Sequence, residues 1–213
     1  MKDEYRHLKP EEIERKSMEI IGEELGGRVF PPDEEPIIRR VIHTTADFDY
    51  ADNLYFSPDA VRLAREALLS GADIVTDTNM AKAGINKALL SRLGGRVHCF
   101  MADEDVAAAA KERGITRASA SMEKAAALGL SAVFAIGNAP TALMTLRELV
   151  MADRILPKLI IGVPVGFVNV IAAKEEIISM ENIPVIVARG RKGGSNVAAA
   201  VCNALIYSLV SRE

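Results

Sequence analysis

The stretch SAVFAIGNAPTAL, residues 131–143, decides the fold. It begins with a short run that is apolar throughout and passes, through Gly137, Asn138 and Pro140, into a stretch with helical spacing. A short apolar run bounded by turn residues is typical of a strand that is buried on both faces. Such strands occur in parallel sheets that carry helices above and below them. The stretch therefore predicts one strand–turn–helix unit of an α/β fold.

The same unit recurs along the chain. Four other apolar runs, ADIVTD, RVHCF, KLIIGV and IPVIVA, occupy residues 72–77, 96–100, 158–163 and 183–188. Between and after the runs lie helical stretches, around residues 82–93, 105–113, 119–128, 141–153, 169–180 and 196–210. Strands that alternate with helices indicate a mostly parallel sheet covered on both faces. Because no repeat or second domain is visible, we predict one doubly wound, three-layer α/β domain over residues 1–213.

The composition narrows the class of partner. The chain has 213 residues, of which 49% are hydrophobic and 26% charged, and its net charge is −3. A negative net charge argues against a nucleic-acid partner, because phosphate binding favours a basic surface. The N-terminal residues MKDEYRHLKPEE lack the apolar run of a secretory signal. The longest apolar stretch, residues 159–173, is short and interrupted by Gly162 and Pro164. We therefore expect a cytoplasmic protein without a membrane partner.

Four strand-to-helix turns carry residues suited to anion binding: TNMAKAG, GNAPTA, PVGFVN and RGRKGGSN. In a parallel α/β sheet these turns emerge at the carboxyl ends of the strands, where ligands bind. Asn, Ser or Thr at a helix start leaves N–H groups and the positive end of the helix dipole facing the cleft. The candidate ligand contacts are Thr78, Asn79, Arg117, Asn138, Thr141, Arg189, Arg191 and Ser195. The turns predict a ligand with several phosphates or carboxylates; the alternative is that Gly and Asn serve only turn geometry.

Motifs for nucleotides, hydrolases and metals are absent from the sequence. There is no G-x-G-x-x-G after a predicted strand, no G-x-x-x-x-G-K-[ST] and no G-x-S-x-G. The histidines, His7, His43 and His98, are too dispersed for a metal site that a sequence would reveal. Cys99 and Cys202 lie in apolar surroundings and are expected to be buried free thiols. We expect neither a metal nor a cofactor.

The stretch RRVIHTTADFDYADNLYF, residues 39–56, contains the strongest candidate for acid–base chemistry. This is His43, because the histidine side chain titrates near neutral pH. If the segment is helical, His43 and Arg40 lie three residues apart on one face. Asp47 could then orient the ring or raise its pKa, whereas Arg39 would lower that pKa. The alternative is a helix end whose His and Thr side chains only satisfy backbone groups.

A helix upstream of this stretch begins near Pro10 and ends at Gly26. It places Ser17 on or beside an apolar stripe. A serine at such a position is usually a close-packing residue and less often a ligand contact. Both interpretations of Ser17 stay open on the pattern alone.

Five motifs together carry a family resemblance: RRVIHTTADFDYADNLYFS, DIVTDTNMAKAGI, AIGNAPTAL, GVPVGFVNV and RGRKGGSNVAAAVCNALI. From about Pro10 to the last helix, the chain resembles the precorrin-8X methylmutases of cobalamin biosynthesis. The resemblance implies an isomerase that moves a methyl group from C-11 to C-12 of a corrin precursor, giving cobyrinate or hydrogenobyrinate, by a [1,5]-sigmatropic shift. It implies that no cofactor is used, that His43 donates and accepts the proton, and that Ser17 and Arg40 contact substrate. It also implies a homodimer that holds this corrinoid tetrapyrrole near the subunit interface.

The family has two branches, which differ in whether the substrate carries cobalt. HTTADFDY and DTNMAKAGI are more similar to the cobalt-precorrin-8 branch, whereas the other branch usually has a Cys-Gly stretch after the histidine. The resemblance therefore implies cobalt-precorrin-8 as substrate, with the cobalt belonging to the substrate. One departure is Ala172-Ala173-Lys174, where a Ser before the Lys is expected.

Two other functions compete with the methylmutase. A non-catalytic corrinoid carrier would share the anion-binding turns but has no need for His43 beside Arg40. A methyltransferase that uses S-adenosylmethionine would need a glycine-rich first turn, and this chain has TNMAKAG there.

Overall fold

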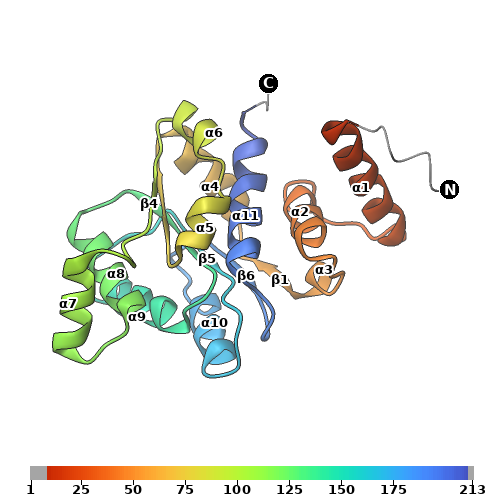
Figure 1. The fold of residues 1–213 in the computed structure, drawn as a ribbon. Coiled ribbons are helices and arrows are strands. Elements are labelled where there is room, and N and C mark those ends of the chain that lie inside the picture. Colours follow the sequence, from red (N-terminus) through yellow and green to blue (C-terminus); the bar gives the residue numbers. More distant parts are fainter. Residues whose placement is uncertain (1–8, 211–213) are drawn as a thin grey trace.

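Within the described residues, six strands form one sheet in the order β1-β6-β5-β4-β2-β3. Figure 1 labels β1, β6, β5 and β4 of this sheet. The computed structural model describes residues 9–210. The strands are β1 (Leu54–Phe56), β2 (Asp73–Thr76), β3 (Val97–His98), β4 (Ala132–Ile136), β5 (Leu159–Gly162) and β6 (Val185–Ala188). All neighbouring pairs are parallel except β1 with β6, which is antiparallel. The five predicted strands are confirmed, and β1 is an edge strand that the sequence analysis missed.

Helices cover both faces of the sheet. On one face lie α1 (Pro10–Glu24), α2 (Glu35–Thr45), α3 (Tyr50–Asn53), α4 (Ala60–Leu69), α5 (Asn79–Gly84), α6 (Lys87–Arg92) and α11 (Ser195–Tyr207). On the other lie α7 (Glu104–Arg113), α8 (Arg117–Ala127), α9 (Pro140–Met151) and α10 (Val170–Ile178). A separate apolar core fills the space on each side. The prediction of a single three-layer, mostly parallel α/β domain is confirmed.

The helix that the sequence predicted over residues 82–93 is instead two short helices, α5 and α6. The chain leaves the helical conformation at Ile85, which is buried. Asn86 then caps α6, since its side-chain oxygen accepts a hydrogen bond of 3.1 Å from the N–H of Leu89. A side chain that caps a new helix ends the preceding one, although the apolar spacing continues.

The first two helices form an outer layer on the α11 side of the sheet. Figure 1 shows α1 outermost, then α2, then α11. The buried face of α2 consists of Ile37, Ile38, Val41 and Ile42. These side chains pack in the same core as α11, which leaves His43, the next residue, exposed beside α1. The position of His43 therefore follows from the apolar spacing of its own helix.

Both cysteines, Cys99 and Cys202, are free and buried, as predicted. Burial raises the pKa of the Cys202 thiol to about 12, because a thiolate would lose its hydration there. No helix within residues 9–210 combines the length and the apolar character needed to cross a membrane.

Candidate functional site

The four predicted anion-binding turns lie side by side at the carboxyl edge of the sheet, because β6, β5, β4 and β2 are parallel neighbours. The Oγ1 of Thr78 and the Oγ of Ser195 are 2.8 Å apart, which joins the turn after β2 to the turn after β6. The N–H of Gly194 donates to the carbonyl of Val163 at 2.9 Å, which adds the turn after β5. Thr78 and Ser195 are thus brought together from distant parts of the chain.

The turn after β4 does not offer its N–H groups to a ligand, contrary to the sequence-based expectation. The carboxylate of Asp77, a buried side chain, accepts hydrogen bonds from the N–H groups of Gly137 at 2.8 Å, Asn138 at 2.8 Å and Ala139 at 2.7 Å. Burial raises the pKa of Asp77, and the three N–H groups oppose that shift. The protein therefore places its own anion at the start of α9, and only the exposed side chain of Asn138 is left for a ligand. An acidic residue directly after a buried strand was the signal for this contact.

Two of the predicted arginines lie over aromatic rings. The guanidinium carbon of Arg189 is 5.0 Å from the ring centre of Tyr55, and its Nε is 4.0 Å from Glu175. The guanidinium carbon of Arg191 is 5.6 Å from the ring centre of Phe167. Phe167 is 82% exposed, so this stacked pair stands at the surface of the turn after β5. A planar guanidinium on an aromatic face keeps its edge available for a carboxylate.

The other predicted contacts on this edge lie around the start of α8. The Oγ1 of Thr141 is 2.8 Å from the Oγ1 of Thr116, the residue that caps α8. Arg117 follows Thr116 and is exposed, and its side chain forms no hydrogen bond or ion pair within residues 9–210. Asn79 is exposed at the first residue of α5. Arg117 is therefore an uncompensated positive charge near the predicted site.

His43 and Ser17 line the same groove between α1 and α2, which has a volume of about 260 Å³. Its remaining lining residues are Ile20, Ile21, Glu24, Ile42, Ala46 and Phe48. The ring of His43 is exposed and forms no hydrogen bond with any other residue of the described part of the chain. The hydroxyl of Ser17 donates to the carbonyl of Ile13 at 2.8 Å, so its oxygen can still accept a hydrogen bond. The groove is thus lined by the ring of His43, by Ser17 and Glu24, and otherwise by apolar residues.

Arg40 lies one helical turn from His43 and forms an ion pair with Glu14 of α1, at 2.6 Å. Its guanidinium carbon is 5.4 Å from the ring centre of Tyr207 in α11. Glu14 in turn precedes Ser17 by three residues, so the ion pair lies next to the groove on both helices. Glu14 has no signal in the sequence, because only the packing of α1 on α2 makes it the partner of Arg40.

Arg39 ties the same two helices together. It forms an ion pair with Glu35 at 2.6 Å, and its guanidinium donates to the carbonyl of Met18 at 3.3 Å. Its guanidinium also fills the space beside Gly22, where an added Cβ would lie 2.7 Å from a terminal nitrogen of Arg39. Arg39 therefore acts as part of the α1–α2 contact, and Glu35 compensates its charge.

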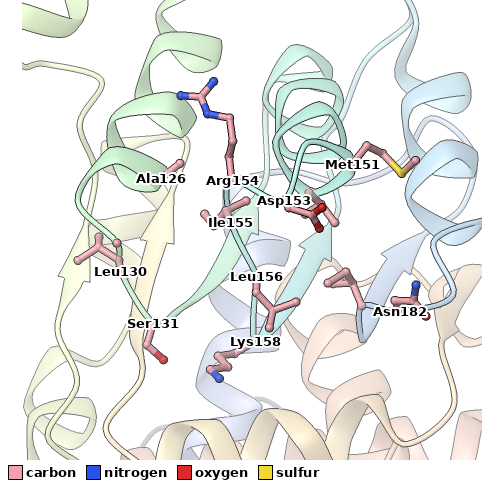
Figure 2. A pocket seen from close by; sticks show the side chains of 13 residues that line it. Ala126, Leu130, Ser131, Met151, Asp153, Arg154, Ile155, Leu156, Lys158 and Asn182 are labelled. Carbon is pink, nitrogen blue, oxygen red and sulfur yellow. The ribbon is translucent and has the colours of Figure 1, made fainter.

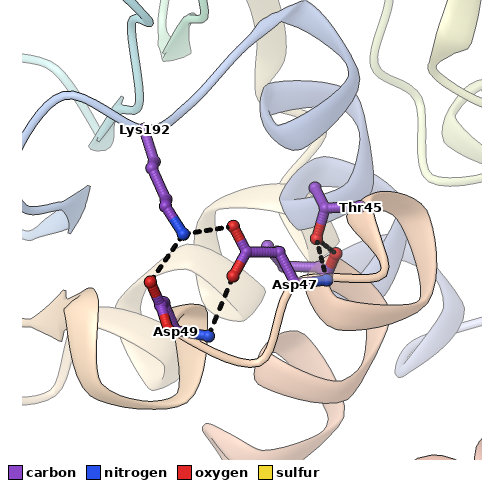
Figure 3. A network of polar contacts seen from close by, with 5 residues as sticks. Thr45, Asp47, Asp49 and Lys192 are labelled. Atoms are coloured by element: carbon purple, nitrogen blue, oxygen red, sulfur yellow. Dashed lines mark hydrogen bonds and ion pairs between the residues drawn. The ribbon is translucent and has the colours of Figure 1, made fainter.

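The carboxylate of Asp47 binds Lys192 and not His43, contrary to the expectation from spacing (Figure 3). The Nζ of Lys192 is 2.6 Å from carboxylate oxygens of both Asp47 and Asp49. The hydrogen bond from Lys192 lowers the pKa of Asp47. Lys192 belongs to the turn after β6, so this contact anchors the loop that follows His43 at the carboxyl edge of the sheet. Within residues 9–210, no three His, Cys, Asp or Glu side chains come together in a way that could hold a metal ion.

A hollow of about 730 Å³ lies at the opposite edge of the sheet, before β4, β5 and β6 (Figure 2). Leu130, Leu156, Lys158 and Asn182 are among its lining residues. It contains none of the predicted site residues, and in parallel α/β sheets ligands bind at the carboxyl edge. The groove at His43, whose neighbouring loop is bound by Lys192 of the carboxyl edge, is therefore the candidate site.

The chain is similar to a known family over nearly its whole length. Residues 12–208 match the family model described as Precorrin-8X methylmutase. Among curated relatives, the cobalt-precorrin-8 methylmutase of Salmonella typhimurium is 45% identical over 206 residues, which cover 94% of this chain and 96% of that protein. The cobalt-precorrin-8 methylmutase of Priestia megaterium is 42% identical over 198 residues, covering 93% and 88%.

Solved structures agree with the sequence comparison. A crystal structure of precorrin-8X methylmutase from Thermus thermophilus superposes with a TM-score of 0.83 at 40% identity, and covers 91% of this chain and 95% of that one. The fold, the sequence and the length covered all match the same family. The chain belongs to the precorrin-8X methylmutase family and is a methylmutase, an isomerase, of cobalamin biosynthesis.

Proposed function

We propose that this methylmutase acts on cobalt-precorrin-8 and moves a methyl group from C-11 to C-12 by a [1,5]-sigmatropic shift, giving cobyrinate, with His43 as acid and base. The observation that carries the proposal is the groove in which the unbonded ring of His43 and the hydroxyl of Ser17 lie together. No cofactor takes part in this scheme, and the cobalt belongs to the substrate.

The surroundings of His43 suit proton exchange with a ligand. An exposed ring without a hydrogen-bond partner has both nitrogens available to a bound molecule. The reaction is an isomerisation, so a proton that the enzyme gives to the macrocycle has to be removed again after migration. One histidine that donates and then accepts satisfies this balance, because an imidazole ring can both donate and accept a proton. Ser17 would accept or donate a hydrogen bond that orients the ring system.

The size of the groove indicates how a tetrapyrrole would bind. At about 260 Å³ the groove is smaller than the 300–1,000 Å³ typical of sites for small organic ligands, and a tetrapyrrole is a large ligand. The macrocycle would therefore lie over the groove and need a further surface to cover its other face. Two apolar side chains of α1, Ile13 and Ile20, are 50% and 43% exposed. A second copy of the chain, in the homodimer that we propose, would supply that cover.

The carboxylate arms of the substrate would bind the arginines and hydroxyls of the carboxyl edge. Arg117 and Arg191 have no ion-pair partner within the part of the chain that the structure describes. Thr78, Asn79, Asn138, Thr141, Arg189 and Ser195 would add weaker contacts. Arg40 is already paired with Glu14, so it would share its guanidinium between that carboxylate and a substrate arm.

The relatives favour the substrate that carries cobalt. Five relatives named cobalt-precorrin-8 methylmutase are 42–45% identical to this chain, and a sixth, from Synechocystis sp., is 38% identical. Two relatives named precorrin-8X methylmutase, from Pseudomonas aeruginosa and Sinorhizobium sp., are 40% and 36% identical. The alternative function, a non-catalytic corrinoid carrier, would not require a free histidine in the groove.

The test combines visible spectroscopy with mass measurement. Purified protein is incubated with cobalt-precorrin-8 in the absence of S-adenosylmethionine, beside the His43→Ala and His43→Gln variants. We expect a spectral change at constant ligand mass in the wild type, and bound but unchanged ligand in both variants, because glutamine keeps hydrogen bonding without proton transfer. Wild-type turnover in either variant would contradict the role of His43. Bound and unchanged ligand in all three proteins, with metal-free precorrin-8 as well, would indicate a carrier.

A further inference from the structure

Lys174 is a fully buried lysine that the proposed reaction does not use. It lies in α10, and its Nζ donates to the carbonyl of Gly190 at 2.9 Å and to that of Lys192 at 2.8 Å. Burial lowers the pKa of Lys174 to about 8, and no carboxylate pairs with it within residues 9–210. Burying an ammonium group beside neutral carbonyls costs folding free energy. The contact is therefore better explained by the loop that it holds than by a gain in stability.

That loop, residues 189–194, connects β6 to α11. Three of its six residues are glycines, and Gly190 has a φ of 74°, in the left-handed region. A loop of this composition has many unfolded conformations and needs external contacts to hold one of them. Lys174 binds the carbonyls on both sides of Arg191, one from each neighbouring residue. Lys174 thus restrains the backbone on both sides of Arg191, including that of Lys192.

Lys192 connects this loop to the residues that directly follow α2. Its Nζ is 2.6 Å from both Asp47 and Asp49 (Figure 3). The N–H of Asp49 donates to Asp47 at 3.0 Å, and the N–H of Asp47 donates to the hydroxyl of Thr45 at 3.3 Å. Thr45 is the last residue of α2, two positions after His43. Hydrogen bonds, joined by the side chain of Lys192, therefore link Lys174 to the final turn of the histidine helix.

We propose that Lys174 and Lys192 are positioning residues for methyl migration, because together they fix the end of α2 that carries His43. An exposed ion pair between long side chains is weak when its backbone is free to move. Here the backbone of Lys192 is held by Lys174, so the pair keeps one geometry. The inference rests on the proposed role of His43. A residue held in its reactive position matters because a displacement of about 1 Å can lower a rate roughly a hundredfold.

The first measurement is amide hydrogen exchange, which does not depend on turnover. The variants are Lys174→Met and Lys192→Met, and the matched control is Lys158→Met, an exposed lysine at the opposite edge of the sheet. We expect Lys192→Met to raise exchange in residues 46–49 only. Lys174→Met is expected to raise it in residues 46–49 and also in residues 189–194, and the control in neither. Unchanged exchange of residues 46–49 in Lys174→Met overturns the inference.

The second measurement is turnover of cobalt-precorrin-8 at saturating substrate. We expect kcat to fall roughly tenfold in each single variant, and the double variant to be no slower than the slower single one, because both act through the same contact. Multiplied losses in the double variant, or a wild-type kcat in either single one, overturn the inference. If Lys174→Met does not fold, the same cycle is run with Lys192→Met and Asp49→Asn, which change exposed residues.

A parallel His43→Gln sample separates this inference from the proposed function. If that variant turns over normally while the exchange pattern is as expected, the proposed role of His43 is wrong. The contact of Lys192 with Asp47 and Asp49 then has no role in catalysis through His43. If His43→Gln is inactive while both lysine variants keep the wild-type kcat, only the inference about Lys174 and Lys192 is wrong.

Discussion

Replacing Asp77 by asparagine tests whether one buried carboxylate holds the carboxyl edge of the sheet together. The side chain is fully buried, and its two oxygens accept three backbone N–H groups from residues 137–139. Asparagine has the same shape but only one acceptor oxygen, with an NH₂ group in place of the other. The change therefore keeps the packing and alters the hydrogen bonds.

The size of the effect follows from the contacts. Oδ2 accepts from Asn138 and Ala139, and Oδ1 accepts from Gly137. If the asparagine oxygen takes the place of Oδ2, its NH₂ group faces the N–H of Gly137, and an unpaired buried N–H costs about 1–3 kcal/mol. The two remaining hydrogen bonds lose their charge assistance, about 1 kcal/mol each. Removal of a buried charge offsets part of this loss. We expect Asp77→Asn to lower the free energy of unfolding by about 2–3 kcal/mol in total.

The assay is equilibrium unfolding in urea, followed by circular dichroism at 222 nm. At a slope of about 2–3 kcal/mol/M, the midpoint of Asp77→Asn falls by roughly 1 M. Asp153→Asn is the control, because Asp153 is exposed and has a φ of 54°, a conformation that asparagine also adopts. Its free energy of unfolding stays within about 0.5 kcal/mol of the wild type. Equal midpoints for Asp77→Asn and the control would refute the role assigned to the buried carboxylate.

Three further predictions concern single residues of the site and its supports. Arg40→Ala weakens corrinoid binding and turnover more than Arg40→Lys does, because lysine keeps the positive charge beside Glu14 and loses only the planar guanidinium. An equal loss of binding affinity in both variants, measured by titration, would argue against a charge contact. Thr78→Val lowers the unfolding free energy by about 1 kcal/mol, since it removes the α5 cap and the contact with Ser195; an unchanged urea midpoint would argue against this. The pKa of Lys174 in the folded protein is about 8, below its ordinary value of 10.5. Between these pH values the unfolded chain binds more protons than the folded chain, so the free energy of unfolding rises with pH, by up to about 3 kcal/mol. Urea midpoints at pH 7.5, 8.5 and 9.5 should show a shallower rise in Lys174→Met than in the wild type, and parallel rises would contradict the shift.

The strands could be predicted from sequence because strands that are buried on both faces consist almost entirely of apolar residues. β4, β5 and β6 are buried at every residue, so their runs are apolar throughout. β1 was missed because Leu54–Phe56 is three residues long, half-buried and, within residues 9–210, paired only to β6. A short edge strand has neither the alternation nor the apolar run that marks a longer one.

The site was predictable only as far as each residue could be recognised by itself. His43 was found from its chemistry, and Ser17 from a resemblance between sequences. Their common groove depends on the packing of α1 on α2, which involves Ile21 and Ile42 and is not fixed by any local pattern. The partner of Asp77 was out of reach for the same reason, because Gly137 is 60 residues away and only the order of the strands makes them neighbours.

The charges of the carboxyl edge change the interpretation of the four anion-binding turns. The sequence suggested that the helix N-termini and the cations of these turns are available to bind the anionic groups of a ligand. In the folded chain, Asp77 already occupies the start of α9, and Lys192 is bound to Asp47 and Asp49. These carboxylates of the protein hold the turns in place. The N–H groups and the lysine that they bind are therefore part of the structure of the site and are not free to bind an anionic ligand. Under the proposed function, the charge available to substrate carboxylates would then be mainly that of Arg117 and Arg191, which lack ion-pair partners within residues 9–210. We infer that the salt dependence of corrinoid binding depends more on these two arginines than on the turns themselves.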